Sequence, residues 1–223
     1  MRIHLQRDIA ALKRKILSLS AVVEESVRMS VRSLQERDFK LATEVIESDL
    51  EVDKMEVQVE EECLKIVALH QPVAVDLRFI VALLKINNDL ERIGDLAVNI
   101  AERAAFLSTQ GNLNVPLDFP GMAEKTQDML RKSLDAFVNM DPRLAREVCA
   151  SDDEVDAINR EMHVQVKDAV LSNPQMVDGL IHILLASRHL ERIADLSTNI
   201  AEDVIYMMEG EIIRHRTEDF RSQ

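Results

Sequence analysis

The sequence has little of what ends a helix and little of what builds a sheet. Among its 223 residues there are five glycines, five prolines and no tryptophan, and aromatic residues make up 3%. So few turn residues and β-favouring aromatics argue against a β-rich fold and predict long helices joined by short turns. The core must then be built mainly from Leu, Ile, Val, Ala and Met.

Cysteines and long apolar runs are also scarce. The two cysteines, Cys63 and Cys149, form no metal-binding or redox spacing, so we expect reduced thiols in the core. The N-terminal stretch lacks the unbroken apolar run of a signal peptide, and no run of about 18 uncharged apolar residues exists. We therefore expect a cytoplasmic protein without a membrane-spanning helix, with peripheral membrane contact at most.

Basic residues are outnumbered by acidic ones. Lys and Arg number 27 against 40 Asp and Glu, which gives a formal net charge of −13. This balance argues against nucleic-acid binding, which needs basic side chains to displace counterions from phosphate. It suits cation binding or a basic partner.

One stretch occurs twice, and the chain is organised around it. Residues 87–102 read NNDLERIGDLAVNIAE, and residues 187–202 read SRHLERIADLSTNIAE, with 10 of 16 positions identical. Self-similarity of this kind indicates a duplicated structural unit. Its repeated polar residues lie four apart, so on a helix they form one stripe. The stripes are Glu91, Asp95 and Asn99 in the first copy and Glu191, Asp195 and Asn199 in the second.

The duplication extends beyond this motif, because LATEVIESDLEVD (41–53) aligns with LAREVCASDDEVD (144–156). Apolar periodicity and the breaks at Asp38, Pro72, Pro142 and Pro174 predict six helices. Long helices with short turns are antiparallel neighbours, so we predict an all-α fold of two tandem homologous three-helix bundles. The predicted helices cover 3–37, 39–69, 73–107, 122–140, 142–171 and 175–215. The predicted divisions are a first bundle (1–107), a linker (108–121), a second bundle (122–216) and a polar tail (217–223).

The second predicted helix carries acids on a face flanked by apolar residues. On a helical wheel, Asp49 and Asp53 share one side with Glu56 and Glu60. Because apolar strips lie on both flanks, we expect Asp49 and Asp53 to point inward. The strips are Leu50, Val57 and Leu64 on one flank and Val52, Met55, Val59 and Cys63 on the other.

The fifth predicted helix repeats this arrangement with Asp152 and Asp156, followed by Asn159 and His163. A buried, unpaired carboxylate costs several kcal/mol, and two on adjacent turns also repel each other. A metal cation, protonation or an arginine must compensate. Mg²⁺, Mn²⁺ and iron favour carboxylate oxygen, and Zn²⁺ accepts it.

Two structural alternatives compete with a metal site. Arg92 and Arg192 can pair with the inward aspartates, and the Glu91 and Glu191 stripes can be solvated faces. In either case the protein is a metal-free helical scaffold. Against simple solvation, the stripe on the third helix continues upstream as apolar residues, among them Leu77 and Val81. A face of this kind is expected to contact something along part of its length.

A carboxylate-bridged metalloenzyme is an alternative of another class. Di-iron chemistry on a helical bundle generally uses a Glu-x-x-His pair, and no histidine here has a glutamate three residues before it. No Ser/His/Asp or Cys/His arrangement and no Gly-rich phosphate loop appears either. The sequence therefore predicts a protein that is not an enzyme.

The segment HQPVAVDLRFIVALLKINNDLERIGDLAVNIAERA (70–104) resembles the PhoU family of phosphate-uptake regulators, and LERIADLSTNIAED (190–203) resembles that family's second repeat. The resemblance covers nearly the whole chain. It implies a regulatory role without catalysis: restraint of the phosphate-starvation response through a sensor histidine kinase, and of uptake through the ATPase subunit of the phosphate ABC transporter. It also implies a homodimer.

The resemblance further implies metal binding by paired E/DxxxD motifs, with the metal being iron, zinc, manganese or magnesium. One departure concerns Arg78 of the DLR segment, because Asp178 stands at the same register in the second repeat. Asn99 and Asn199 are candidate additional residues of the metal-binding faces. The implied ligands are Asp49, Asp53, Glu91 and Asp95 in the first repeat and Asp152, Asp156, Glu191 and Asp195 in the second.

Overall fold

The structure is a computed structural model that describes residues 2–111, 115 and 117–210. Within these residues it contains six α-helices, one short 3₁₀ turn and no strand, which confirms the all-α prediction. The 3₁₀ turn, Pro174–Met176, directly precedes the last helix. The helices are α1 (Arg2–Glu36), α2 (Phe39–His70), α3 (Ala74–Ser108), α4 (Phe119–Asn139), α5 (Pro142–Ser172) and α6 (Val177–Glu209).

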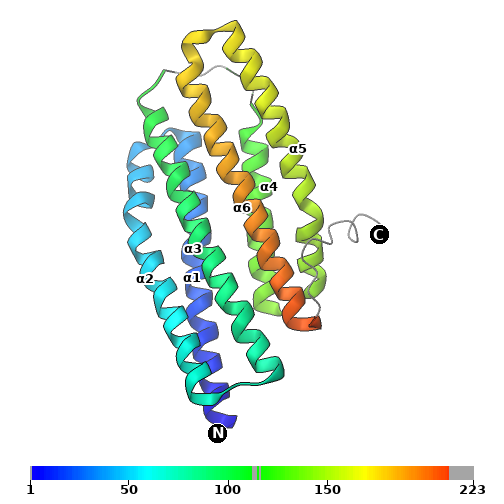
Figure 1. Cartoon of the computed structure of the whole chain (residues 1–223). Helices are drawn as coiled ribbons and strands as arrows, with labels where there is room; N and C mark the ends of the chain where they lie inside the picture. The colour runs from blue at the N-terminus through cyan, green and yellow to red at the C-terminus, as the bar shows by residue number, and fades with distance from the viewer. Residues whose placement is uncertain (1, 112–114, 116, 211–223) are drawn as a thin grey trace.

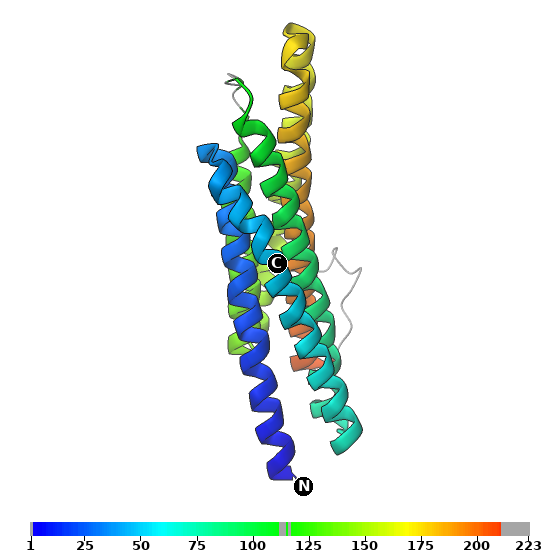
Figure 2. The same cartoon turned by 90° about the vertical axis from the view of Figure 1, so that its left-hand side faces the viewer.

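The six helices form two antiparallel triplets, as predicted, and the triplets share one core. α1 packs against α2 and α3, α4 packs against α5 and α6, and α3 packs against α6. In Figure 1, α2, α3, α6 and α5 lie side by side, and Figure 2 shows α1 and α4 on one side of this layer. Nearly all buried apolar residues of both triplets belong to a single cluster. The repeats are therefore joined through α3 and α6 into one body.

The helix boundaries follow from capping chemistry. The Asp38 carboxylate accepts hydrogen bonds from the N–H groups of Lys40 and Leu41, and Asp141 caps α5 in the same way. Both caps agree with the predicted breaks. α4 begins at Phe119 rather than at residue 122, because Asp118 caps it and Pro120 is tolerated in a first turn. α6 ends at Glu209, because Gly210 adopts a left-handed conformation there, and residues 211–215 of the predicted sixth helix, like the predicted tail, lie outside the described residues.

The core is built from aliphatic side chains, as the composition predicts. An apolar seam along α1, which includes Leu12, Ile16 and Val23, is buried against the neighbouring helices. Cys63 is also buried, and burial raises its pKa to about 12, so its thiol is unreactive. α1 is longer than α4, 35 residues against 21, and its N-terminal end extends beyond the layer (Figure 2).

The seam between α3 and α6 is antiparallel. Lys85 of α3 lies 3.3 Å from a carboxylate oxygen of Asp203 in α6. Nearer the end of α3, the Phe106 ring stacks on the His182 ring at a centroid distance of 3.7 Å. This register places Gly94, in the middle of the first motif copy, level with Ala194 in the second. The two copies therefore run past each other along the centre of the molecule.

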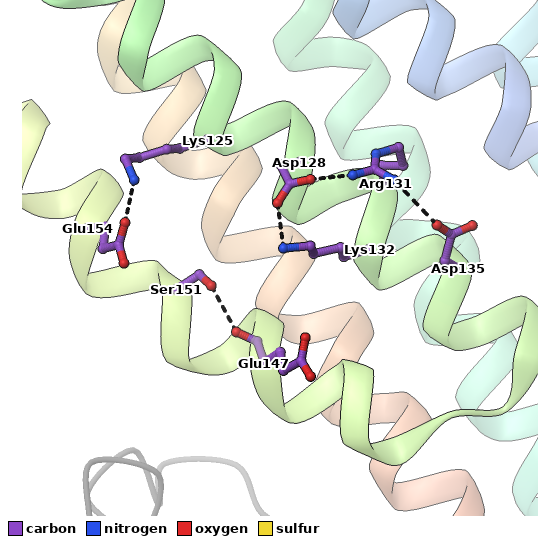
Figure 3. Close-up of polar contacts among 8 residues, drawn as sticks. All are labelled: Lys125, Asp128, Arg131, Lys132, Asp135, Glu147, Ser151 and Glu154. Carbon is purple, nitrogen blue, oxygen red and sulfur yellow. Dashed lines mark hydrogen bonds and ion pairs between the residues drawn. The ribbon is translucent and has the colours of Figure 1, made fainter.

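One exposed ion pair connects α4 and α5 at the surface, and further ion pairs lie along α4 itself (Figure 3). Lys125 of α4 pairs with Glu154 of α5, and Lys132 lies 2.7 Å from Asp128 on α4 itself. Pairs of this kind are screened by water and contribute less than about 1 kcal/mol each. The packing of α4 on α5 therefore depends on their buried apolar residues more than on these surface pairs.

Candidate metal centres

The first candidate centre lies between α2 and α3 and is called here the first acid cluster: Asp49, Asp53, Glu91 and Asp95. Burial raises the pKa of Asp49, and the carboxylates of Asp53 and Asp95 raise it further. The pKa of Glu91 is raised by burial and then by nearby carboxylates, Asp95 the strongest. The structure thus brings the acids of the two helices within electrostatic reach of one another.

The second acid cluster, Asp152, Asp156, Glu191 and Asp195, lies between α5 and α6 in the equivalent position. Burial raises the pKa of Asp152 to about 6, with added repulsion from Asp195 and Asp156. The pKa of Asp195 is also raised, by burial and by Glu191 and Asp156. Raised acid pKa values in both clusters mean that negative charge there is incompletely compensated.

Close packing of α2 on α3 at Gly94 positions the acids of the first cluster beside one another. A Cβ atom added to Gly94 would lie only 3.1 Å from Cγ1 of Val52. Gly94 is fully helical and buried, so its value here is small size rather than conformational freedom. The short approach brings Asp49 and Asp53 alongside Asp95 and Glu91.

The expectation that Asp49 and Asp53 point inward is only partly met. Asp49 is half-buried, but Asp53 is exposed. The reason is that, within the part of the chain that the structure describes, α2 packs only against α1 and α3, so just one of its two apolar strips is covered. The acids lie at the edge of the core, where carboxylates retain water. Asp95 and Asp195 are likewise exposed, whereas Asp152 and Asp156 are half-buried.

Arginine compensates the second cluster more than the first. Arg160 lies 3.5 Å from Asp156, and Arg192 lowers the pKa of Asp195, although burial and neighbouring acids outweigh it. In the first repeat, Arg92 instead lies 3.4 Å from Asp89, which is outside the cluster. The groups that shift the pKa of Asp49 and Glu91 are all acidic. Arginine therefore compensates part of the negative charge of the second cluster, which is what a metal-free scaffold would need there.

A polar pair that the sequence prediction left out of the site lies beside each cluster. The buried Asn87 amide donates to the Glu56 carboxylate at 2.9 Å and to the Glu56 main-chain oxygen at 3.0 Å. In the second repeat, the Ser187 hydroxyl donates to the Asn159 side-chain oxygen at 3.1 Å. Burial, then Glu60 and Asp53, raise the pKa of Glu56, so Glu56 belongs electrostatically to the first cluster. The sequence feature that could have assigned Glu56 to the site is its spacing of three residues from Asp53, which places both on one side of the helix.

The two candidate asparagines are placed differently from a ready ligand. The Asn99 amide donates to the main-chain oxygen of Asp95 at 2.7 Å, so its NH₂ group faces its own helix. Asn99 and Asn199 are both half-buried.

The donor chemistry of both clusters suits a multivalent cation, since carboxylate oxygens are what Mg²⁺, Mn²⁺ and iron bind. Within the described residues, however, no three Asp, Glu, His or Cys side chains converge closely enough to hold one ion. Binding would require the half-exposed and exposed carboxylates to turn toward a shared ion. The residues fit a metal by type, and their surface position leaves them free to turn.

The same part of the chain contains no helix that is both long and apolar enough to cross a membrane. Its architecture is that of a duplicated helical-bundle protein with a carboxylate cluster in each repeat. The PhoU domain model matches residues 16–104 and 119–204, one match in each repeat. The chain therefore belongs to the PhoU family.

Relatives and solved structures agree with this assignment. The chain is 36% identical to the phosphate-specific transport system accessory protein PhoU homolog of Aquifex aeolicus, covering 94% of this chain and 95% of that protein. It superimposes on the crystal structure of PhoU from Pseudomonas aeruginosa with a TM-score of 0.89 and 34% identity, covering 92% of this chain and 99% of that one. The Streptococcus pneumoniae phosphate transport system regulatory protein PhoU shares the fold, with a TM-score of 0.83 over 93% of this chain and 98% of that one, at 24% identity.

Proposed function

We propose that this chain is a cytoplasmic, non-enzymatic regulator of phosphate transport. The observation that carries the proposal is the family match in both repeats, together with near full-length relatives named as accessory proteins of a phosphate-specific transport system. The chain restrains the phosphate-starvation response and phosphate uptake. It does so by contacting the ATPase subunit of the phosphate ABC transporter and the sensor histidine kinase, and it acts as a homodimer.

Deletion of the gene tests the regulatory role. A phosphate-starvation reporter, which is silent in wild-type cells at high phosphate, should become active in the deletion strain under the same conditions. Reintroduction of the gene should silence it again. A reporter that stays silent after deletion contradicts the regulatory proposal. Light scattering of the purified protein tests the dimer independently, since a mass near 25.3 kDa would correspond to a monomer.

We also propose that the two acid clusters bind metal ions, with iron, zinc, manganese or magnesium as candidates. Support comes from the raised pKa values of Asp49, Glu91, Asp152 and Asp195, which show carboxylates grouped without full compensation. A bound cation supplies the missing positive charge and stabilises the folded state. In this role the metal fixes the helix pairs in position rather than taking part in a reaction.

Thermal unfolding with and without metal tests this second proposal. Chelator-treated protein should gain several degrees in Tm when Mn²⁺ is added in excess, and Asp152→Ala with Asp195→Ala should gain less. A metal-free scaffold is the alternative, and the exposure of Asp53 and Asp95 and the lack of a converged ligand set favour it. An unchanged Tm with each of the four candidate metals would establish that alternative.

A further inference from the structure

α2 is apolar on two opposite sides. Its inner row, Val52, Val59 and Ile66, repeats every seven residues and is only 1% exposed at each position. An outer row repeats with the same spacing on the other side of the helix. Its members remain in water although they are large and apolar. The outer row is Leu50, Val57 and Leu64, which are 66%, 47% and 56% exposed.

Nothing in the described chain covers this outer row. α2 packs against α1 and α3 and against no other helix. It lies at one edge of the layer in Figure 1, with its outward side free. Phe39, at the start of the same helix and on the same side of it, is 58% exposed and extends the row. A helix with a single apolar stripe needs one partner, whereas one with two opposite stripes has room for a second.

The duplicated fold does not require the outer row, because α5 lacks it. In α5 the inner positions keep their apolar character as Val155 and Met162, which are buried. The outer positions aligned with Leu50, Val57 and Leu64 are instead charged and exposed. Val164 and Leu171 are exposed apolar residues on the same side of α5, so what α5 lacks is the continuous three-member row rather than every exposed apolar residue. The α5 counterparts are Asp153, Arg160 and Lys167.

The charges beside the outer row indicate what kind of surface fits it. One side of the row is acidic, with Asp53 and Glu60, whereas the other side is mixed, with Glu61, Lys54 and Lys65; all five are exposed. A second copy placed on this row would bring one acidic margin against another. A segment with an apolar stripe and Lys or Arg along one edge would cover the row and neutralise its acidic margin.

We propose that the outer row of α2 is a docking surface for an amphipathic, basic helix of a partner protein. Leu50, Val57 and Leu64 take up its apolar residues, and Glu60, which lies outside the first acid cluster, attracts its cations. The surface belongs to the first repeat alone, so the two repeats differ in what they contact. This inference rests on the proposed function, since the partner is one of the proteins through which the chain regulates transport.

Binding of purified full-length chain to immobilised transporter ATPase subunit and to the cytoplasmic part of the sensor kinase tests the inference. Leu64→Asp should weaken binding to one of them at least tenfold, and Val57→Lys should do the same. The matched control is Lys167→Asp, which places the same residue at the equivalent point of α5 and should leave binding within twofold. All three positions are exposed, so the variants should keep the wild-type Tm within a few degrees.

The salt dependence of binding distinguishes the charged contacts of the surface from its apolar contacts. Raising salt from 50 to 500 mM should weaken wild-type binding, because the Glu60 contact is screened. Glu60→Gln, which leaves the first acid cluster intact, should reduce this salt dependence. If the wild type binds one partner and Leu64→Asp binds it equally well, the docking surface is wrong while the regulatory function stands. If the wild type binds neither, the proposed partners are wrong. A Leu64→Asp variant that changes the oligomeric state in light scattering would assign the row to a second copy and overturn the proposal.

Discussion

Lys85 of α3 donates a hydrogen bond to the carboxylate of Asp203 in α6 and joins the two repeats across their central seam. The Asp203 side chain is almost completely buried, whereas that of Lys85 reaches water. The Lys85 ammonium also lies 5.3 Å from the centre of the Tyr206 ring, a cation–π contact within the same seam. The packing of one repeat on the other therefore includes a charge that water does not reach.

Loss of Lys85 should be costly because it removes a cation from the side of the buried Asp203 carboxylate. We expect Lys85→Met to lower the free energy of unfolding by about 2 to 3 kcal/mol. The double variant Lys85→Met, Asp203→Leu should recover most of that loss. Urea unfolding followed by circular dichroism measures both. Lys132→Met, which removes an exposed partner of Asp128 (Figure 3), is the control and should cost no more than about 0.5 kcal/mol. Equal losses for Lys85→Met and Lys132→Met would contradict the importance of the seam.

Gly94 should resist substitution although it lies inside a helix. Alanine favours a helix over glycine by about 1 kcal/mol, but its Cβ would crowd Cγ1 of Val52 at 3.1 Å. Overpacking costs about 1 to 3 kcal/mol, so we expect Gly94→Ala to destabilise the protein by about 1 kcal/mol. Combining Gly94→Ala with Val52→Ala should remove the crowding, so the two changes should be non-additive in urea unfolding. Simple additivity of the two losses would show that the contact exerts no strain.

Asp152 should make the metal-free protein less stable as the pH rises. Its pKa is raised from 3.8 to about 6, so the folded state holds a proton that the unfolded state has released. This stabilising effect is fully present below pH 4 and is lost as the pH rises through 6. Asp152→Asn should therefore stabilise chelated protein at pH 7 by about 1 to 2 kcal/mol after allowance for solvent screening, and by nothing near pH 3.5. Urea unfolding at both pH values measures this difference. Asp168→Asn, which removes an exposed carboxylate elsewhere on α5, is the control for a general effect of removing one charge.

The His182 and His189 side chains should act in the opposite direction. Burial lowers the pKa of both, and the Arg103 guanidinium lowers each further. The unfolded state therefore takes up protons before the folded state does, and stability should fall as the pH drops below about 6.5. His189→Gln should reduce that loss between pH 7 and pH 5 in thermal unfolding. An unchanged pH dependence in this variant would exclude His189 as a cause.

Much of the fold could be predicted because local chemistry sets it. Asp38 and Pro142 ended and restarted helices where the structure has them, and the four-residue spacing of Glu91 and Asp95 put both on one stripe. A helical wheel gives directions but not neighbours, so it could not tell that α2 is covered on one side only. For that reason Asp53 was expected inside and is exposed.

The contacts between the two repeats could not be predicted from the sequence pattern. Nothing in the periodicity of α3 or α6 paired Lys85 with Asp203 or stacked Phe106 on His182, since such contacts depend on the register of two distant helices. The outer row of α2 shows that the sequence pattern could also predict burial where there is none. Leu50, Val57 and Leu64 were read as a flank of the core, and in the structure they are exposed.

Metal content per chain tests the central claim, that each repeat gathers carboxylates to bind a cation. Chelated protein would be dialysed against Mn²⁺, and in parallel against iron, zinc and magnesium, and its bound metal counted by elemental analysis. We expect the wild type to retain metal, Asp49→Ala with Glu91→Ala to lose the share of the first repeat, and Asp152→Ala with Asp195→Ala to lose that of the second. Wild-type protein that retains no metal, or double variants that retain as much as the wild type, would contradict the account.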